Sequence, residues 1–151
     1  MQFDVKTPEL KTLLRYWTEK AGDRSMPSRS ALDPIVDIPH ITPNIWLVDV
    51  EGEPPTFRFR LLGTQVIEHY GSNFTGKRLD EMDFGGRGDA IRHEYQETVA
   101  ARRPTYARHL IKIPETGRVL MYERLLLPLS DDGKAVNLVL GGGYPLEDLD
   151  E

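Results

Sequence analysis

The chain of 151 residues contains no cysteine. Without a thiol it cannot use a cysteine nucleophile, form a flavin–cysteinyl adduct, or bind zinc or an iron–sulfur cluster through sulfur. It also lacks any apolar run approaching the ~20 residues that cross a bilayer. Its first residues, MQFDVKTPELK, include an early acidic residue and no apolar core of a signal peptide, so we expect a cytoplasmic protein without a membrane partner.

Basic residues are fewer than acidic ones: the chain has 19 Lys and Arg and 24 Asp and Glu, which gives a net charge of −5. General nucleic-acid binding requires a basic surface and is therefore not expected. The residues that are present include 39% hydrophobic and 28% charged side chains. This balance and the length predict one folded domain that can bury a core.

An amphipathic helix is predicted near the N-terminus. Thr7-Pro8 is typical of a helix start, and Gly22 is a helix stop. The apolar residues between them share one face, at positions i, i+3, i+4 and i+7: Leu10, Leu13, Leu14 and Trp17. This stripe predicts either a helix that covers the outer face of the chain's own sheet or one that meets a second copy in a homodimer.

Four prolines then punctuate residues 23–43, which predicts an ordered connector without long helices. We accordingly divide the chain into three parts. Residues 1–43 form a helix and proline-rich connector that packs on the core, 44–145 form the core, and 146–151 form an acidic tail.

The core is predicted to contain five strands, over residues 45–48, 57–61, 105–113, 118–130 and 135–142. In the second, Phe57, Phe59 and Leu61 alternate with arginines, so they are expected to face inward. A short helix over 65–70, a helical turn over 79–81 and a longer helix between Asp89 and Pro104 separate the second strand from the third. The order predicts an α+β fold in which short helices cover one face of an antiparallel sheet.

Several short motifs carry a resemblance to a known family. They are Arg15-Tyr16-Trp17, Pro27-Ser28-Arg29, Phe59-Arg60-Leu61-Leu62-Gly63-Thr64 and Tyr122-Glu123-Arg124-Leu125-Leu126-Leu127-Pro128-Leu129. Together they resemble the single-domain bacterial PAS subfamily, common in alphaproteobacteria and formerly catalogued as a domain of unknown function. The resemblance implies a PAS fold, in which a small molecule or cofactor binds between sheet and helices, and association with copies of itself or with other signalling proteins.

A ligand site is predicted on the inner face of the sheet. Arg124 is its most informative member, because a guanidinium inside an apolar strand must be paired. Its partner is either a ligand carboxylate or phosphate or an internal carboxylate, unless the side chain faces outward and Glu123 faces in. The expected lining residues are Phe59, Leu61, His69, Tyr95, Thr98, His109, Tyr122, Arg124 and Leu126.

Other chemistries find little support. Residues 71–77 fit the first seven positions of a phosphate-binding loop, but Arg78 replaces the hydroxyl residue and a helix precedes the segment, so we predict a turn. No metal site is predicted, and haem is disfavoured, with His69 and His93 as its only candidate ligands. The cofactor, if there is one, is left unknown. No convergent catalytic set is visible, so we expect no enzymatic activity.

The sequence therefore predicts a sensory or regulatory PAS module. It would bind a small ligand between sheet and helices and signal through contacts with a second copy or a signalling protein. The alternative is an adaptor that binds proteins without a ligand. An enclosed cavity favours the first, and an unusually large exposed apolar patch favours the second.

Overall fold

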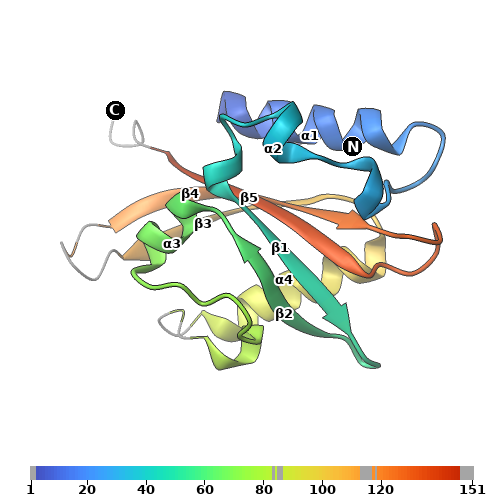
Figure 1. Ribbon diagram of the computed structural model, residues 1–151. Helices are drawn as coiled ribbons and strands as arrows, with labels where there is room; N and C mark the ends of the chain where they lie inside the picture. The colour runs from blue at the N-terminus through green and yellow to red at the C-terminus, as the bar shows by residue number, and fades with distance from the viewer. Residues whose placement is uncertain (1–2, 83, 85–86, 113–116, 118, 147–151) are drawn as a thin grey trace.

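A computed structural model describes residues 3–82, 84, 87–112, 117 and 119–146. Five strands form one sheet in the order β2-β1-β5-β4-β3, and every neighbouring pair is antiparallel (Figure 1). The strands are β1 (Ile45–Glu51), β2 (Thr56–Leu62), β3 (Thr105–Lys112), β4 (Val119–Leu129) and β5 (Leu138–Leu146). The predicted α+β fold with a five-stranded antiparallel sheet is confirmed.

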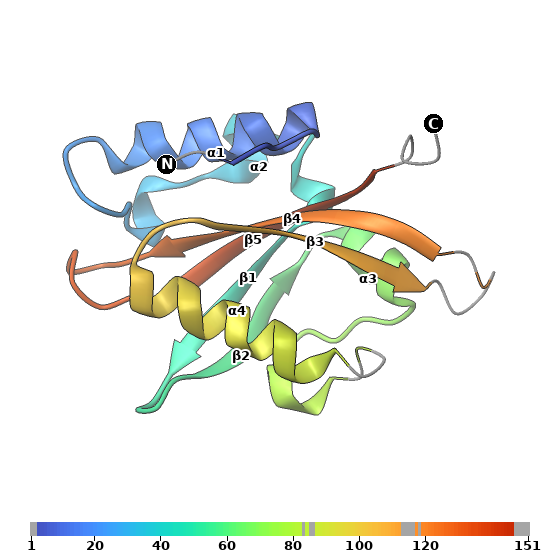
Figure 2. The ribbon, with the colours of Figure 1, turned by 180° about the vertical axis from the view of Figure 1, so that it is seen from behind.

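The helices lie on both sides of this sheet (Figures 1 and 2). On one side, the outer face, are α1 (Pro8–Ala21) and α2 (Pro34–Asp37); on the other, the inner face, are α3 (Thr64–Tyr70) and α4 (Gly88–Ala101). Single 3-10 turns cover Arg29–Ala31, Thr42–Asn44 and Leu79–Glu81. Within the described ranges, no helix combines the length and apolar character needed to span a bilayer.

Helix α1 buries its apolar stripe against the chain's own sheet. Leu10 and Leu13 are fully buried and Trp17 is 4% exposed, whereas Leu14 is only partly buried. The Trp17 indole donates a hydrogen bond to the Pro128 carbonyl in β4, at 2.8 Å. The stripe therefore covers the outer face of the chain's own sheet, which is the first of the two predicted roles; its part in a homodimer stays a prediction.

A buried carboxylate holds the start of α1 on the outer face. Glu123 in β4 is fully buried and accepts hydrogen bonds from the backbone N–H groups of Lys6, at 2.6 Å, and Thr7, at 2.8 Å. The Tyr106 hydroxyl also donates to it. Burial opposes ionisation, but these hydrogen bonds outweigh it and lower the pKa of Glu123. The segment before α1 is thus anchored by an ionised, saturated acceptor.

Glycines let both layers approach β5. A Cβ on Gly142 would lie 2.4 Å from Cδ2 of Leu13 in α1, and one on Gly141 would lie 2.1 Å from the Trp46 ring on the inner face. Both glycines lie within β5, where the absence of side chains lets the Trp46 ring and α1 pack directly on the backbone.

The last strand is displaced from its predicted range of 135–142. The Asp132 carboxylate accepts hydrogen bonds from the backbone N–H groups of Lys134, at 2.8 Å, and Ala135, at 2.9 Å, so the turn extends further than the Asp-Gly pair indicates. The strand therefore starts later and continues to Leu146. Residues 147–151 of the predicted tail lie outside the described residues, and the three-part division of the chain stays a prediction.

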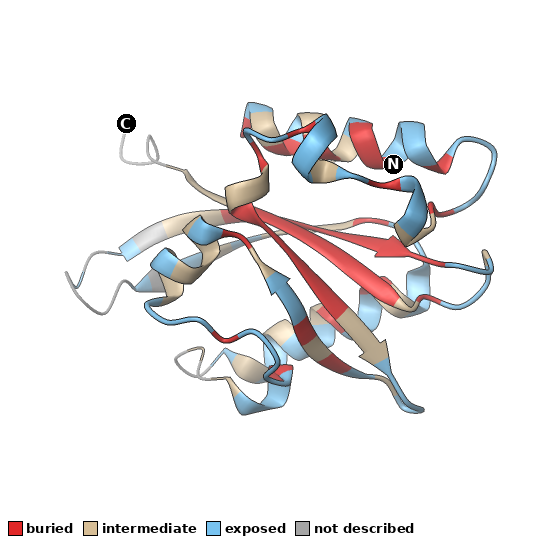
Figure 3. Cartoon of the chain, in the orientation of Figure 1, coloured by how far each residue is buried: buried red, intermediate tan, exposed pale blue. Residues whose placement is uncertain are grey.

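One residue predicted to face inward does not. Val48 pairs with Phe59 but Leu47 pairs with Leu61, so Arg60 is an extra residue in β2. A bulge of this kind reverses the alternation of side chains beyond it. Leu61 is accordingly 42% exposed, and its predicted inward orientation is wrong. Figure 3 shows the resulting contrast, with β5 and much of β1 buried and β2 partly exposed.

Candidate functional site

The inner face of β3 and β4 gathers the polar residues that the sequence singled out. Tyr122, Arg124 and Leu126 alternate along β4, and the register places His109 opposite Tyr122. Helix α4 lies against these strands and brings Glu94 to the same place. Strands position Arg124 and His109 and a helix positions Glu94, so the cluster depends on how α4 packs on the sheet.

An ion pair and a histidine form the centre of this cluster. Nη2 of Arg124 lies 2.7 Å from Oε1 of Glu94, and Nε2 of His109 lies 3.0 Å from the same oxygen. Arg124 is only 6% exposed. Burial raises the pKa of Glu94, but the His109 hydrogen bond and the Arg124 charge together lower it. The internal partner that the sequence left open for Arg124 is therefore Glu94.

This ion pair leaves most of the guanidinium unsatisfied. Nε and Nη1 of Arg124 are buried and have no hydrogen-bond acceptor among the described residues. The Nη2 contact with Glu94 is short, yet its angle does not meet hydrogen-bond geometry, so it is a charge contact rather than an aligned hydrogen bond. A buried cation with free N–H groups is costly, which marks this residue for explanation.

His69 provides a second unsatisfied group. This side chain of α3 packs edge-on against the Tyr122 ring, with centroids 5.7 Å apart, and its Nδ1 is buried without a partner in the described part of the chain. Burial lowers the pKa of His69 and raises that of Tyr122. Tyr122 itself lies over Gly143, where a Cβ would be 2.3 Å from its ring. His69 thus contacts Tyr122, which lies two residues before Arg124 on the same side of β4.

Two other predicted residues are fully engaged. The Tyr95 hydroxyl accepts a hydrogen bond from the Trp46 indole at 2.9 Å, and burial raises its pKa to about 12. Thr98 is completely buried; its hydroxyl donates to the Glu94 carbonyl at 2.8 Å and shares a hydrogen bond with Thr105 at 2.6 Å. Both residues hold α4 to the sheet.

The apolar members of the predicted set belong to the core. Phe59 packs edge-on against Phe74, with centroids 4.7 Å apart, and Leu126 is fully buried. Leu61 lies on the other face, beyond the bulge. Of the nine predicted residues, Arg124 and His69 have unsatisfied polar atoms among the described residues, Leu61 lies on the opposite face of the sheet, and the others are packed or hydrogen-bonded.

Sequence reasoning missed Glu94. A usable signal was present, because Glu94 precedes Thr98 by four residues and so shares its face of α4. A carboxylate on the helix face that turns toward the sheet is the expected internal partner for a buried arginine.

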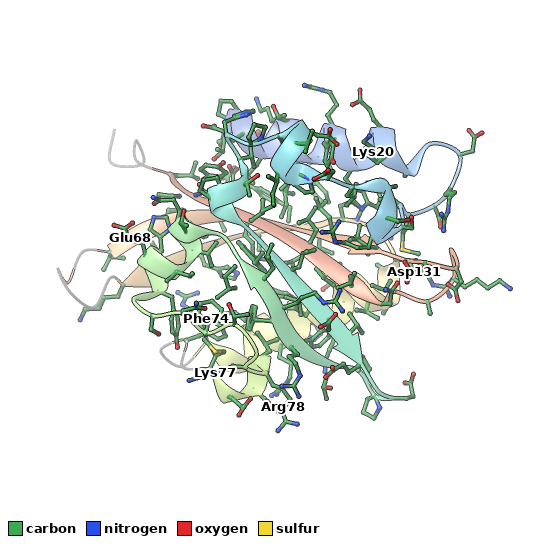
Figure 4. All side chains as sticks on the ribbon, in the orientation of Figure 1. Lys20, Glu68, Phe74, Lys77, Arg78 and Asp131 are labelled. Atoms are coloured by element: carbon green, nitrogen blue, oxygen red, sulfur yellow. The ribbon has the colours of Figure 1, made fainter. Side chains whose placement is uncertain are left out.

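The segment that partly fits a phosphate-binding loop borders the sheet instead. Figure 4 shows Phe74 directed toward the interior, whereas Lys77 and Arg78 lie at the margin of the molecule. The Phe59 N–H donates to the Lys77 carbonyl at 2.9 Å, and the Gly76 N–H donates to the Phe59 carbonyl at 2.7 Å. The segment therefore extends the edge of β2, and two of its backbone groups are already bonded there.

The two histidines considered for haem have different surroundings. The His93 side chain is 75% exposed and lies 3.9 Å from Glu97 on the surface of α4. His69 is half-buried beside Tyr122 on the inner face. In the described portion, no three His, Asp or Glu side chains are grouped as a metal site would require.

Comparison with known families gives one match, to the PAS domain over residues 5–142. No curated protein matches the chain. Solved structures with a similar fold include the PAS domain of Bordetella pertussis BvgS, at 23% identity over 72% of this chain and 81% of that chain, with a TM-score of 0.56.

Two more distant structures extend this likeness. The Rhodobacter sphaeroides LOV protein is 11% identical over 96% of this chain and 70% of its own, with a TM-score of 0.56. A PAS domain from Colwellia psychrerythraea is 12% identical over 76% and 98%, with a TM-score of 0.54. At these identities the likeness concerns the fold. Since this chain lacks cysteine, it cannot form a flavin–cysteinyl adduct.

Proposed function

Because the chain belongs to the PAS domain family, we propose that it is a sensory module that binds a small molecule on its inner face and signals through protein contacts. The fold supports a sensory or regulatory role in general. The ligand and the route of the signal are the specific parts of the proposal.

The observation that carries the proposal is the set of unsatisfied polar atoms on the inner face. Nε and Nη1 of Arg124 and Nδ1 of His69 are buried without partners among the residues described. Most buried polar groups in proteins are hydrogen-bonded, so each exception requires an explanation, and we attribute these to a bound ligand. His69 comes from α3 and Arg124 from β4, so a ligand bound between the sheet and the helices would contact both layers.

The proposal includes no catalytic step. Glu94 is committed to Arg124 and His109, and the Tyr95 hydroxyl to Trp46, so these groups have structural partners. General acid–base catalysis needs a group free to exchange its proton with a substrate. Binding therefore explains the cluster with fewer assumptions than turnover.

The ligand-free adaptor is retained as a second candidate because apolar side chains are exposed. Leu110 and Val119 are 48% and 59% exposed on the β3–β4 hairpin, and Ile35 and Val36 are 67% and 70% exposed on α2. Such residues suit protein contacts when they form a patch. We also propose that a homodimer would form through these exposed residues rather than through the α1 stripe. A cytoplasmic location is a separate part of the proposal, and cell fractionation tests it.

Native mass spectrometry of protein purified from its natural host tests ligand binding. We expect a stoichiometric small molecule that is lost on denaturation. Ala107, which the register places opposite Arg124 on the inner face, offers a blocking variant. Ala107→Leu should reduce the retained molecule at least tenfold, whereas Arg108→Leu, at the adjacent outward position, should retain it.

The adaptor would be supported if the purified protein carries no small molecule and if it and its Ala107→Leu variant bind a protein partner equally well. Equal retention by both variants would place the bound molecule elsewhere on the chain. Circular dichroism of both variants checks that each is folded.

A further inference from the structure

We propose that a groove on the outer face, between α1 and the segment before it, binds an acidic segment of a partner protein in which carboxylates and apolar side chains alternate. The groove has a volume of about 430 Å³ and is lined by Phe3, Val5, Lys11, Leu14, Arg15 and Thr18. In Figure 2 the segment before α1 runs alongside that helix. This surface lies across the sheet from the inner-face site, so the inference goes beyond the ligand site of the proposed function.

Contacts with β3 and β4 hold the wall of the groove that precedes α1. The Phe3 ring stacks on the Tyr106 ring, with centroids 5.7 Å apart. Nη2 of Arg108 donates to the Asp4 carbonyl at 2.8 Å. The buried Glu123 carboxylate accepts two backbone N–H groups from the residues that follow. A wall that is already fixed lowers the entropic cost of binding a partner.

Apolar side chains of both walls face the groove. Leu14 is the member of the α1 stripe that packing on the sheet leaves only partly buried, and Phe3 on the opposite wall is also partly buried. Val5 lies between them in the groove lining and is 6% exposed. The groove therefore offers apolar contact to a partner where the stripe is incompletely covered.

Two cations without a partner line the same groove. Lys11 and Arg15 are exposed and one turn apart on α1, and neither forms an ion pair with a described residue. Asp4, on the opposite wall, does not compensate them, because it pairs with other cations. Its Oδ2 lies 3.1 Å from Nζ of Lys6 and 3.7 Å from Nη2 of Arg108. In a chain of net charge −5, this groove is thus a local basic site that attracts carboxylates.

The spacing of the two cations matches an extended segment. Residues one turn apart on a helix have Cβ atoms about 5–6 Å apart, and every second residue of a strand recurs after about 6.6 Å. Carboxylates at alternate positions therefore face both cations, while the apolar side chains between them point into the groove. A helix is about 10–12 Å across with its side chains, so a groove of about 430 Å³ takes an extended segment more readily.

Charge decides against other occupants. A two-fold contact between copies through this groove would bring Lys11 and Arg15 of one copy against the same residues of the other, and like charges repel. Binding to nucleic acid or to an anionic membrane relies on clusters of basic residues. Here the described residues supply two unpaired cations and an apolar lining. An acidic protein segment is the occupant that these observations favour.

Isothermal titration calorimetry of the full chain with synthetic peptides tests the inference. The probe is the capped hexapeptide Glu-Leu-Glu-Leu-Glu-Leu, and the two controls replace every Glu with Gln or every Leu with Ser. We expect the probe to bind with a Kd below about 1 mM at low ionic strength. Each control should bind at least about fivefold more weakly. Raising the salt concentration to about 0.5 M should also weaken binding, because salt screens exposed charges.

Charge reversal on the chain assigns the binding to the groove. Lys11→Glu and Arg15→Glu should each weaken binding about fivefold, and the double variant should abolish it. Lys77→Glu is the matched control, because Lys77 is also exposed and lies at a margin of the molecule away from α1 (Figure 4). It should bind the probe as the unaltered chain does. Circular dichroism checks that each variant is folded.

The inference is wrong if the probe does not bind, if the Gln peptide binds equally well, or if the double variant binds unchanged. It is also wrong if a deoxythymidine decamer or vesicles with about 30% phosphatidylserine bind more tightly than the probe, because the groove then takes phosphates. None of these results bears on the inner-face ligand, which mass spectrometry tests separately.

Two further measurements separate the remaining occupants. A dimer in analytical ultracentrifugation that the double variant dissociates would assign the groove to a second copy. A chain that ends at Leu146 and binds the probe at least about tenfold tighter than the full chain would assign it to residues 147–151, whose sequence is also acidic. Either result overturns the assignment to a partner protein, whereas equal binding by the shortened and full chains supports it.

Discussion

The two faces of β4 treat adjacent charged residues in opposite ways. Glu123 points to the outer face, where two backbone N–H groups and the Tyr106 hydroxyl donate to it. Arg124 points to the inner face, where one carboxylate contacts one of its nitrogens and two others have no acceptor within the described ranges. The hydrogen-bonding capacity of Glu123 is thus used within the chain, whereas that of Arg124 is largely unused among the described residues.

The outer face is not perfectly satisfied, but its exceptions are neutral. The hydroxyl oxygens of Thr7 and Tyr144 are buried without partners in the described part of the protein. An unsatisfied neutral hydroxyl costs about 1–3 kcal/mol, and an unsatisfied charged group costs more. The outer face is therefore closed by α1, whereas the inner face holds a buried charge with fewer partners among the described residues, which is the basis of the proposed ligand site.

The largest expected effect is on the outer face. Glu123→Ala leaves the Lys6 and Thr7 N–H groups and the Tyr106 hydroxyl without their acceptor. We expect a loss of about 3 kcal/mol in the free energy of unfolding, measured by urea denaturation. Glu97→Ala, at an exposed site on α4, is the control and should change it by less than about 0.5 kcal/mol. A loss below about 1 kcal/mol in Glu123→Ala would contradict the picture of a closed outer face.

The glycines of β5 compare the two faces directly and should give the next largest effect. Gly141→Ala would place a methyl group 2.1 Å from the rigid Trp46 ring, and Gly142→Ala would place one 2.4 Å from a terminal methyl of Leu13. A leucine can rotate more easily than a hydrogen-bonded indole. We expect about 2–3 kcal/mol for Gly141→Ala and about 1 kcal/mol for Gly142→Ala, by denaturation.

Gly88→Ala is the matched control for both glycine variants, because a Cβ there meets nothing within 4 Å. It should leave stability unchanged or slightly higher, since alanine favours a helix. If Gly142→Ala proves the more damaging of the two, the outer layer is the more rigid one.

Local rules predicted most of the fold. The apolar stripe with its proline start predicted α1 nearly residue by residue, and the predicted order of five strands and a longer helix is the observed one. They failed where tertiary contacts decide. Nothing local reveals the extra residue Arg60 in β2, because a bulge depends on the partner strand, so Leu61 was assigned to the wrong face.

The site was predicted by residue type more than by contact. Arg124 was identified because a charge in an apolar strand requires a partner, Tyr122 because it shares one side of that strand, and His109 because it lies on another predicted strand; the structure places His109 opposite Tyr122. The partner of Arg124 was not predicted. The spacing of Glu94 and Thr98 places both on one face of α4, but the contact between Glu94 and Arg124 depends on how that helix packs on the sheet.

Lowering the pH should have the smallest effect on stability among these predictions, and it acts on the buried carboxyls of both faces. The pKa values of Glu123 and Glu94 are both held below the ordinary value of 4.5. A carboxyl with a lower pKa in the folded chain stabilises fully above the unfolded value, and this contribution is lost as pH falls through the folded pKa. We therefore expect the free energy of unfolding to be constant near neutral pH and to decline below about pH 4.5.

Replacing each carboxyl by an amide then shows how much of the loss of stability at low pH comes from each face. Glu123→Gln should flatten the dependence on pH more than Glu94→Gln, because Glu123 is fully buried and accepts three hydrogen bonds, whereas the Glu94 side chain is 21% exposed. Urea denaturation between pH 7 and 3 measures both curves. Equal flattening would show that the ion pair on the inner face contributes as much to stability as the anchor on the outer face, and that Arg124 is structurally satisfied by Glu94 despite its free N–H groups.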